Sequence, residues 1–176
     1  GVPSTRRILK DGDLVKIDIC ASWKGYCADM ARCFLIGKAS EQSNIIKMVD
    51  VATQALFAGV AQAIVGNRLS DISAAIQQVV EREGFGVVRD FAGHGIGKSM
   101  LEEPEILNYG EPGRGPILRA GMTFAIEPMI TEGRYPVYVD SDGWTVKTVD
   151  KSWAAHVEDT ILITDNGPVF LTRQQN

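Results

Sequence analysis

The sequence lacks several features that would point directly to a partner or a compartment. It has no long run of Lys and Arg and a net charge of −4, so electrostatics does not predict binding to nucleic acid or to an anionic membrane. No apolar stretch approaches the length of a membrane span, and the first residues contain no apolar core of a secretory signal. Internal repeats and low-complexity tracts are also absent. What remains is a chain of 176 residues, 45% of them apolar and 23% charged, which predicts one soluble globular domain.

Cysteine is scarce as well. The three cysteines are Cys20, Cys27 and Cys33, and an odd number in a chain of this size does not indicate a disulfide framework. Their spacings of seven and six residues also differ from the short Cys pairs of structural zinc sites. We therefore expect free, reduced thiols in a cytoplasmic protein, packed as small apolar side chains.

Residues 15–34 have the pattern of a β-hairpin. Apolar residues alternate along the first half, as they do in a strand of a sheet, and Lys24-Gly25 is suited to a two-residue turn. If the turn lies there, Trp23 faces Tyr26, and the register of the whole hairpin follows from that pair.

Two aspartates lie in this hairpin, where a buried strand would normally have none. In the register set by the turn, Cys20 faces Asp29 and Asp18 faces Ala31, so both carboxylates point to the same side of the sheet. Diagonal neighbours of this kind have Cβ atoms roughly 7–8 Å apart. Because two carboxylates at that separation repel unless a proton or a cation lies between them, the pair predicts a metal site.

Two amphipathic helices are expected after the hairpin. The apolar period of the first extends from Ile45 to Ile64, where Gly66 supplies a stop. The second follows Ser70 and ends just before Gly84. Each has one apolar and one polar face, which indicates a scaffold packed on a sheet, and we assign no chemistry to either.

The second half of the chain contains further predicted strands, and polar residues interrupt several of them. His94 lies in the glycine-rich segment GHGIG, although a lone histidine in such a segment is more often structural. Glu127 lies beside a proline and is either the exposed edge of its strand or a ligand that points into a polar centre. Glu158 precedes an apolar run, with His156 and Thr160 on the same face. The predicted strands are residues 87–91, 122–130, 143–148 and 156–164.

Five residues therefore stand out as polar exceptions in apolar surroundings. Taken singly, each is more often a surface or edge residue than a ligand. Taken together, they are an oxygen-rich set with one imidazole, which suits a dinuclear site for divalent transition metals that share bridging carboxylates. The five are Asp18, Asp29, His94, Glu127 and Glu158.

The motifs that contain these residues resemble, in order and in local spacing, those of the type I methionine aminopeptidases. The match extends over nearly the whole chain, and Glu127 follows GHGIG without the long insertion that marks the type II enzymes. The resemblance implies an α+β pita-bread fold, in which a curved antiparallel β-sheet has helices packed on its outer face. The motifs are IDICASWKGYCADMARCF, GHGIG, MTFAIEPM and DGWTVKTVDKSWAAHVEDTILIT.

The resemblance also implies two divalent metal ions, with Co, Mn, Fe or Zn as candidates. Asp29 and Glu158 would bridge the ions. Asp18 would chelate one ion, and His94 and Glu127 would bind the other. A water that bridges both ions would attack the scissile carbonyl, with Glu127 as the general base. The implied reaction is removal of the N-terminal methionine of nascent proteins or peptides by a monomeric, cytoplasmic enzyme.

Three further residues correspond to positions that contact substrate in the family. Met100 and Trp144 match positions that line the pocket for the methionine side chain. Leu101 stands where the family has a histidine that contacts the substrate carbonyl, and leucine cannot donate a hydrogen bond. Because the loss of a positioned donor typically costs a factor of about 10²–10³ in turnover, we expect weakened activity. His156 and Asp159 are further departures, which replace a glutamine and a histidine common in the family.

Two other interpretations remain open. A catalytically impaired homologue on the same fold could act as a binding protein, which Leu101 favours. A prolidase-like peptidase is less favoured, because the second histidine motif of those enzymes is absent. In either case the resemblance implies one catalytic domain over residues 1–176 that lacks the family's usual N-terminal portion, and the chain begins with Gly1 instead of methionine.

Overall fold

The computed structural model describes residues 3–37 and 43–173, which contain two helices and twelve strands. The helices are α1 (Ser43–Gln62) and α2 (Leu69–Arg82). The strands are β1 (Leu14–Trp23), β2 (Tyr26–Leu35), β3 (Gly86–Val87), β4 (Gly93–Gly95), β5 (Glu102–Ile106), β6 (Thr123–Ile126), β7 (Met129–Thr131), β8 (Val137–Val139), β9 (Val146–Thr148), β10 (Ala154–His156), β11 (Glu158–Thr164) and β12 (Gly167–Phe170).

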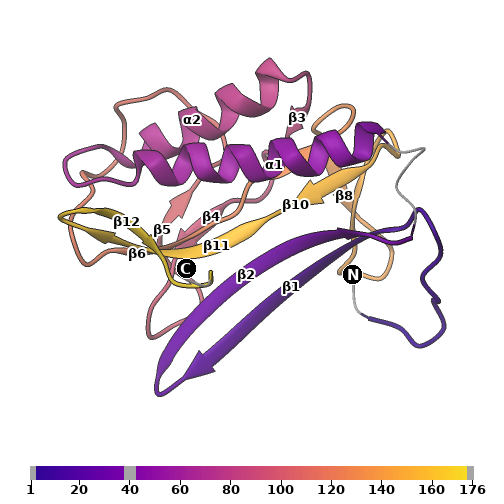
Figure 1. Cartoon of the computed structure of the whole chain (residues 1–176), viewed down its shortest axis with the longest axis horizontal. Helices are drawn as coiled ribbons and strands as arrows, with labels where there is room; N and C mark the ends of the chain where they lie inside the picture. Colours follow the sequence, from indigo (N-terminus) through magenta and orange to yellow (C-terminus); the bar gives the residue numbers. More distant parts are fainter. Residues whose placement is uncertain (1–2, 38–42, 174–176) are drawn as a thin grey trace.

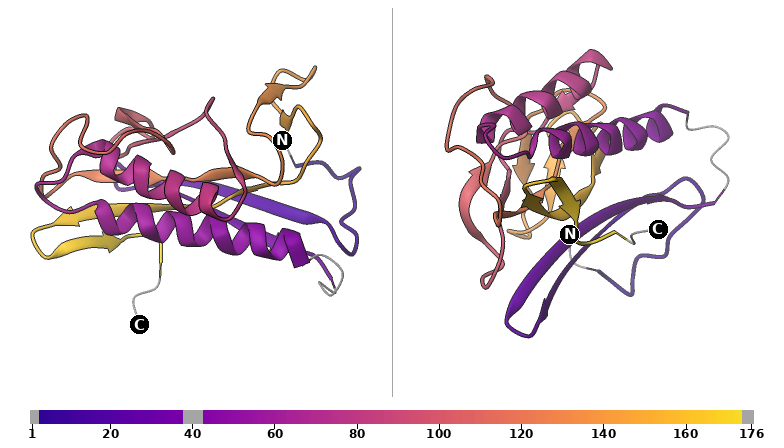
Figure 2. Two further views of the ribbon diagram at one scale, coloured as in Figure 1. Left: turned by 90° about the horizontal axis from the view of Figure 1, so that it is seen from above. Right: turned by 60° about the vertical axis from the view of Figure 1, so that its left-hand side comes forward.

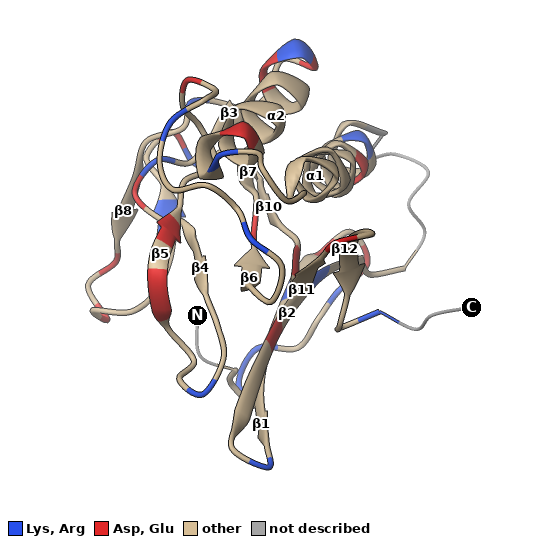
Figure 3. Ribbon diagram, turned by 90° about the vertical axis from the view of Figure 1, so that its left-hand side faces the viewer, with Lys and Arg blue, Asp and Glu red and all other residues tan. Residues whose placement is uncertain are grey.

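Seven strands form the main sheet. Their order is β1-β2-β11-β6-β4-β5, with β12 paired to β11, and every neighbouring pair is antiparallel. The sheet curves, so that the long β1–β2 hairpin projects on one side and β4 and β5 bend down on the other (Figure 1, Figure 3). Both helices cover the outer face of the sheet and lie side by side (Figure 2). The expected α+β fold, a curved antiparallel sheet with helices on its outer face, is confirmed.

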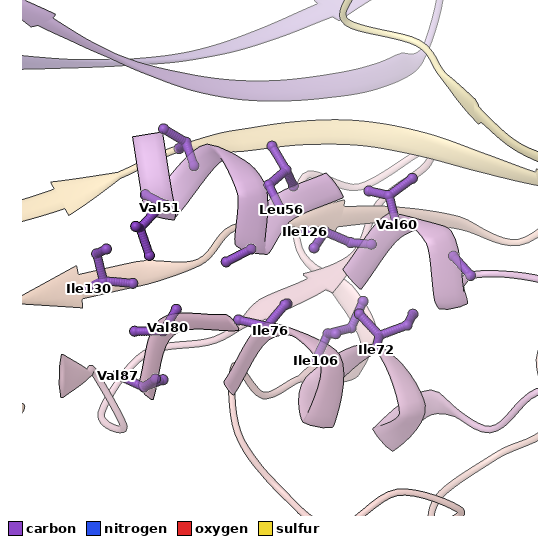
Figure 4. Close-up of a cluster of buried hydrophobic side chains, with 14 of the residues drawn as sticks. Val51, Leu56, Val60, Ile72, Ile76, Val80, Val87, Ile106, Ile126 and Ile130 are labelled. Atoms are coloured by element: carbon purple, nitrogen blue, oxygen red, sulfur yellow. The ribbon is translucent and has the colours of Figure 1, made fainter. Parts of the chain in front are cut away.

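The hydrophobic core lies between the helices and the sheet. Figure 4 shows apolar side chains of α1 and α2 packed against those of β5, β6 and β7, and Leu56, Ile76 and Ile126 are fully buried. A Cβ atom at Gly59 of α1 would lie 2.7 Å from Cγ1 of Ile76, so glycine at this position lets the two helices approach. By length and composition alone, Asn44–Gln62 of α1 could cross a membrane, but here its apolar face forms part of the core.

The helix ends agree with the expected ones to within two residues. α2 begins one residue before Ser70, and the Asp71 carboxylate accepts a hydrogen bond of 2.7 Å from the backbone N–H of Arg68. The first turn is therefore held by Asp71 instead of by the serine. The chain leaves α2 at Gly84, which has a φ of +83° as a glycine helix stop allows, and α1 ends two residues short of Ile64.

The β1–β2 hairpin has the predicted turn and register. Lys24 and Gly25 have φ angles of +51° and +82°, the left-handed backbone that a type I′ turn requires at both positions. Because the turn fixes the register, all the predicted pairs are present: Trp23–Tyr26, Cys20–Asp29 and Asp18–Ala31.

The position of β1 differs from the buried strand that its apolar alternation suggests. β1 is the outermost strand of the main sheet, and Ile17 and Ile19 on its apolar face are exposed. Alternation reports which residues share a face, whereas burial depends on what covers that face.

Two of the predicted strands are each broken in two. The segment 122–130 forms β6 and β7 with a break at Glu127 and Pro128, and the segment 156–164 contains the end of β10 and all of β11 with a break at Val157. β6 and β11 belong to the main sheet, whereas β7 and β10 form a three-stranded sheet with β3. The two breaks are adjacent, because the Val157 N–H donates to the Pro128 carbonyl at 3.4 Å. Glu127 and Val157 therefore lie where the chain passes between the two sheets.

The remaining strand predictions hold only in part. The predicted strand 87–91 is reduced to the short β3, and the glycine-rich segment around His94 forms β4. Of the segment 143–148, only the second half is a strand, β9, which pairs with the unpredicted β8. β5 was also not predicted, because its sequence EEPEI contains three acids and a proline and resembles a loop.

Candidate metal centre

The five predicted ligands come from five separate segments. Asp18 lies on β1, Asp29 on β2 and His94 on β4, while Glu127 lies at the break after β6 and Glu158 begins β11. The structure brings all five together, along with two residues not assigned as ligands from the sequence. Their ligand atoms form three overlapping groups, within each of which the atoms lie within 4.8 Å of one another: Asp18, Cys20 and Asp29; Asp29, His94 and Glu158; Glu127, His156 and Glu158.

Asp29 and Glu158 link these groups, since each belongs to two of them. Both are buried, and Glu158 is only 1% exposed. They lie on the neighbouring strands β2 and β11, where the Thr160 hydroxyl accepts a hydrogen bond from the Asp29 N–H at 2.9 Å and donates one to the Asp29 carbonyl at 2.8 Å. The two carboxylates are therefore held side by side, where each could serve two ions.

The cluster has more negative charge than its surroundings compensate. Burial, and then the nearby carboxylates of Glu127, Asp29 and Asp18, raise the pKa of Glu158 to about 10. Partial desolvation and the Asp29 carboxylate also raise the pKa of Asp18, although part of this side chain is exposed. One oxygen of Asp29 (Oδ1) and one of Glu158 (Oε1) are buried without a hydrogen-bond partner among the described residues. Buried carboxylate oxygens without donors fit divalent cations, which supply the missing positive charge.

The His94 imidazole is oriented by its own strand. Its Nδ1 lies 2.8 Å from the Gly95 carbonyl, and since a carbonyl only accepts hydrogen bonds, Nδ1 carries the proton. The lone pair of Nε2 is therefore free on the side where Nε2 lies 3.6 Å from Oε1 of Glu127. The flanking glycines allow this close packing, because a Cβ at Gly93 would lie 2.4 Å from the Ala125 carbonyl oxygen and one at Gly95 2.2 Å from that of Glu103.

Cys20 and His156 are the two residues that the sequence interpretation did not assign to the site. The Cys20 thiol donates to Oδ2 of Asp29 at 3.1 Å, and partial burial together with this bond raises the pKa of the thiol to about 12. Nε2 of His156 lies 3.3 Å from Oε2 of Glu127 and 3.9 Å from Oε2 of Glu158. Cys20 stands two positions from Asp18 and His156 two positions from Glu158, and that spacing could have identified them.

The expectation that all three cysteines pack as apolar residues is therefore wrong for Cys20, whose thiol contacts a carboxylate. It is correct for Cys33, which packs against the hydrophobic core. The Sγ atom of Cys27 lies 3.8 Å from the carbonyl oxygen of Lys98. All three thiols are free, as the odd number predicted.

The three proposed substrate contacts lie in connections between strands. Met100 and Leu101 lie between β4 and β5, and Leu101 is 72% exposed. Trp144 lies in the connection between β8 and β9 and is 68% exposed. Two surface cavities of about 450 and 420 Å³ lie beside the end of α2 and between β1 and the β8–β9 hairpin, and neither includes these residues or the acid cluster.

Comparisons with known proteins agree with one another. Residues 1–165 match the model of metallopeptidase family M24. A methionine aminopeptidase of Clostridium acetobutylicum is 52% identical over 172 residues, which are 98% of this chain and 68% of that protein. The crystal structure of a methionine aminopeptidase from Thermotoga maritima superposes with a TM-score of 0.95 at 44% identity, covering 99% of this chain and 69% of that one. Prolidase from Pyrococcus furiosus is more distant, with a TM-score of 0.70 at 27% identity over 96% of this chain and 43% of that one.

Proposed function

The chain belongs to the methionine aminopeptidases of metallopeptidase family M24, and from this premise we propose that it hydrolyses the first peptide bond of proteins or peptides that begin with methionine. It has the pita-bread fold of these enzymes. The chain spans about two thirds of the length of the methionine aminopeptidases it matches, so the activity is proposed for this chain as it stands. One hydrophobic core shared by α1, α2 and the sheets supports a single catalytic domain.

The observation that carries the proposal is the uncompensated negative charge of the buried cluster. We propose that two divalent ions bind there, with Asp29 and Glu158 shared between them because these two residues link the three groups of ligand atoms. Asp18 would complete the site on the β1 side, and His94 and Glu127 the site on the β4 side. When bound, such ions supply Lewis-acid chemistry that polarises a carbonyl and makes a water more acidic. Carboxylates with imidazole suit Co, Mn, Fe or Zn.

Glu127 is the residue that moves the proton. Its two carboxylate oxygens lie 3.6 Å from the His94 imidazole and 3.3 Å from that of His156, and its side chain is largely buried. Glu127 takes a proton from the attacking water as the water oxygen bonds to the scissile carbonyl carbon. It then gives that proton to the leaving nitrogen as the C–N bond breaks, so the two products are free methionine and the shortened chain.

Leu101 sets the expected level of activity. A leucine side chain at this exposed position cannot donate a hydrogen bond to the substrate carbonyl, so we propose weakened turnover by a factor of about 10²–10³. The same observation favours one alternative, a homologue that binds metal and N-terminal methionine without cleaving. The two functions differ in whether Leu101→His produces turnover.

The test uses the chain loaded with Co²⁺, Mn²⁺, Fe²⁺ or Zn²⁺ in turn and the peptide Met-Ala-Ser, with release of methionine measured by mass spectrometry. We expect slow, metal-dependent release of methionine alone, faster release by Leu101→His, and none from the N-acetylated peptide. Glu127→Gln is expected to abolish release. If the protein binds metal and neither the wild type nor Leu101→His releases methionine, the binding function is correct and the enzyme function is not.

A further inference from the structure

We propose that His156 is an additional ligand of the metal centre, so that the site has two imidazoles instead of one. The inference rests on the metal centre proposed above and adds a residue that the resemblance does not assign to it, since glutamine is common in the family at this position.

The His156 ring is positioned to bind one metal ion together with Glu127 and Glu158. Its Nε2 lies 3.3 Å from Oε2 of Glu127 and 3.9 Å from Oε2 of Glu158, and the three atoms form one of the groups capable of holding an ion. Yet Nε2 is buried and makes no hydrogen bond with any described residue, these two carboxylates included. A cation bound by Nε2 of His156 and by the two neighbouring carboxylate oxygens would explain why this buried nitrogen makes no hydrogen bond to them.

Contacts to the main chain of His156 and Val157 fix the backbone that carries this ring. The carbonyl of His156 accepts a hydrogen bond from the Cys33 thiol at 3.2 Å, and the residue pairs with Met129 in the β10–β7 ladder. The next residue, Val157, donates its N–H to the Pro128 carbonyl at 3.4 Å. These contacts fix the backbone on both sides of His156, beside the break at Glu127 and Pro128, and the ligand atoms of Glu127, His156 and Glu158 lie within 4.8 Å of one another.

A second imidazole changes which divalent metal ions the site binds most tightly. Nitrogen ligands favour Zn, Co and Ni relative to Mn and Mg, whereas a set of carboxylates with a single imidazole discriminates less. His156→Gln, which restores the family's common residue, is therefore expected to weaken Zn²⁺ or Co²⁺ binding by at least about 10-fold and Mn²⁺ binding by less. Isothermal titration with each ion measures this difference.

The direct test uses the fact that the chain contains only two histidines, His94 and His156. Tag-free protein is labelled with ¹⁵N in histidine, loaded with ¹¹³Cd²⁺ and examined by NMR, with bound cadmium measured by metal analysis. His156→Gln assigns the two rings. We expect ¹¹³Cd–¹⁵N coupling on both imidazoles, and retained coupling on both in Cys33→Ala, which removes the bond to the His156 main chain but leaves the ring.

The outcomes separate this inference from the proposed function. Coupling on the His94 ring alone overturns the role of His156 and leaves the five-residue centre in place. Bound cadmium with coupling on neither ring, or no bound cadmium, contradicts the metal centre itself and with it both proposals.

Discussion

Two neighbouring buried acids at the start of β11, Asp159 and Glu158, differ in how their negative charge is compensated. Asp159 is 0% exposed and Glu158 is 1% exposed, and adjacent strand residues point to opposite faces of the sheet. On one face, Asp159 is paired with Arg32 and with Arg173, each at 2.6 Å, and accepts a hydrogen bond from Thr172 at 2.7 Å. On the other, Glu158 has no Lys or Arg partner among the described residues and faces three further carboxylates.

The two carboxylates differ in the source of the compensating positive charge. A buried carboxylate keeps its negative charge only where a positive charge compensates it, and for Asp159 the chain itself supplies two arginines. For Glu158 we infer that the cation is a metal. The two faces are also connected, because Arg32 donates to the main-chain carbonyls of Glu158 and Ala31 while it pairs with Asp159. The arginine that pairs with Asp159 therefore also holds the main chain at Glu158.

The largest loss of stability from a single substitution is expected when the ion pairs of Asp159 are broken. Asp159→Asn keeps the shape of the side chain but leaves Arg32 and Arg173 without their counter-charge, which costs about 3 kcal/mol, near the low end for buried pairs because both arginines are partly exposed. Denaturant unfolding of the metal-free protein measures this loss. The control Asp165→Asn, at an exposed turn, should change stability by less than about 0.5 kcal/mol. A similar small change for Asp159→Asn would mean that its ion pairs contribute little.

Per bound ion, a slightly smaller effect is expected when the unpaired face, that of Glu158, loses its metal. Removal of metal by a chelator should destabilise the protein, because the carboxylates are left without cations while still desolvated. At a free metal concentration of 100 times Kd, bound metal contributes about 2.7 kcal/mol per site, so the melting temperature should fall on chelation. Differential scanning calorimetry measures the shift. An unchanged melting temperature would count against a buried metal site.

The two hairpin aspartates should differ in their effect on metal content. Asp29 is buried and belongs to two groups of ligand atoms, whereas Asp18 is exposed and belongs to one. Asp29→Ala should therefore lose both ions, and Asp18→Ala should weaken mainly one, by about 10- to 100-fold in affinity. Metal analysis after dialysis provides the comparison, and equal losses in the two variants would contradict the assignment of Asp29 as a bridge.

The smallest effect, counted per pH unit, is a dependence on pH. The pKa of Glu158 is raised from 4.5 to about 10 in the fold, so between these values the unfolded chain releases a proton that the metal-free fold keeps. The stability of the metal-free protein should therefore fall as pH rises through this window, by at most about 1.4 kcal/mol per pH unit from this group. Unfolding curves at several pH values would show the slope, which should be flatter in Glu158→Gln. A slope that the substitution does not change would assign the pH dependence to other groups.

The sequence predicts the parts of this site that depend on local geometry. The Lys24-Gly25 turn fixes the register of the hairpin, and the register places Asp18 and Asp29 on one face. Apolar periodicity likewise predicts both helices. These features follow from neighbouring residues alone.

The rest depends on contacts between distant segments. The strand breaks at Glu127 and Val157 arise because the chain passes from one sheet to another, and no residue there signals which partner comes next. The partners of Asp159 are equally unpredictable, since Arg32 lies 127 residues away in sequence. The exposure of Ile17 and Ile19 depends on the place of β1 at the edge of the sheet, which alternation alone does not reveal.

The most direct test of the central claim is the unfolding free energy of Glu158→Gln, measured with and without metal. Glutamine has nearly the same shape as glutamate and cannot carry the charge that the chain leaves uncompensated. We expect that at neutral pH Glu158→Gln is at least as stable as the wild type without metal and gains little or nothing when metal is added. A variant that is less stable than the wild type without metal, and that is still stabilised by metal to the same extent, would contradict it.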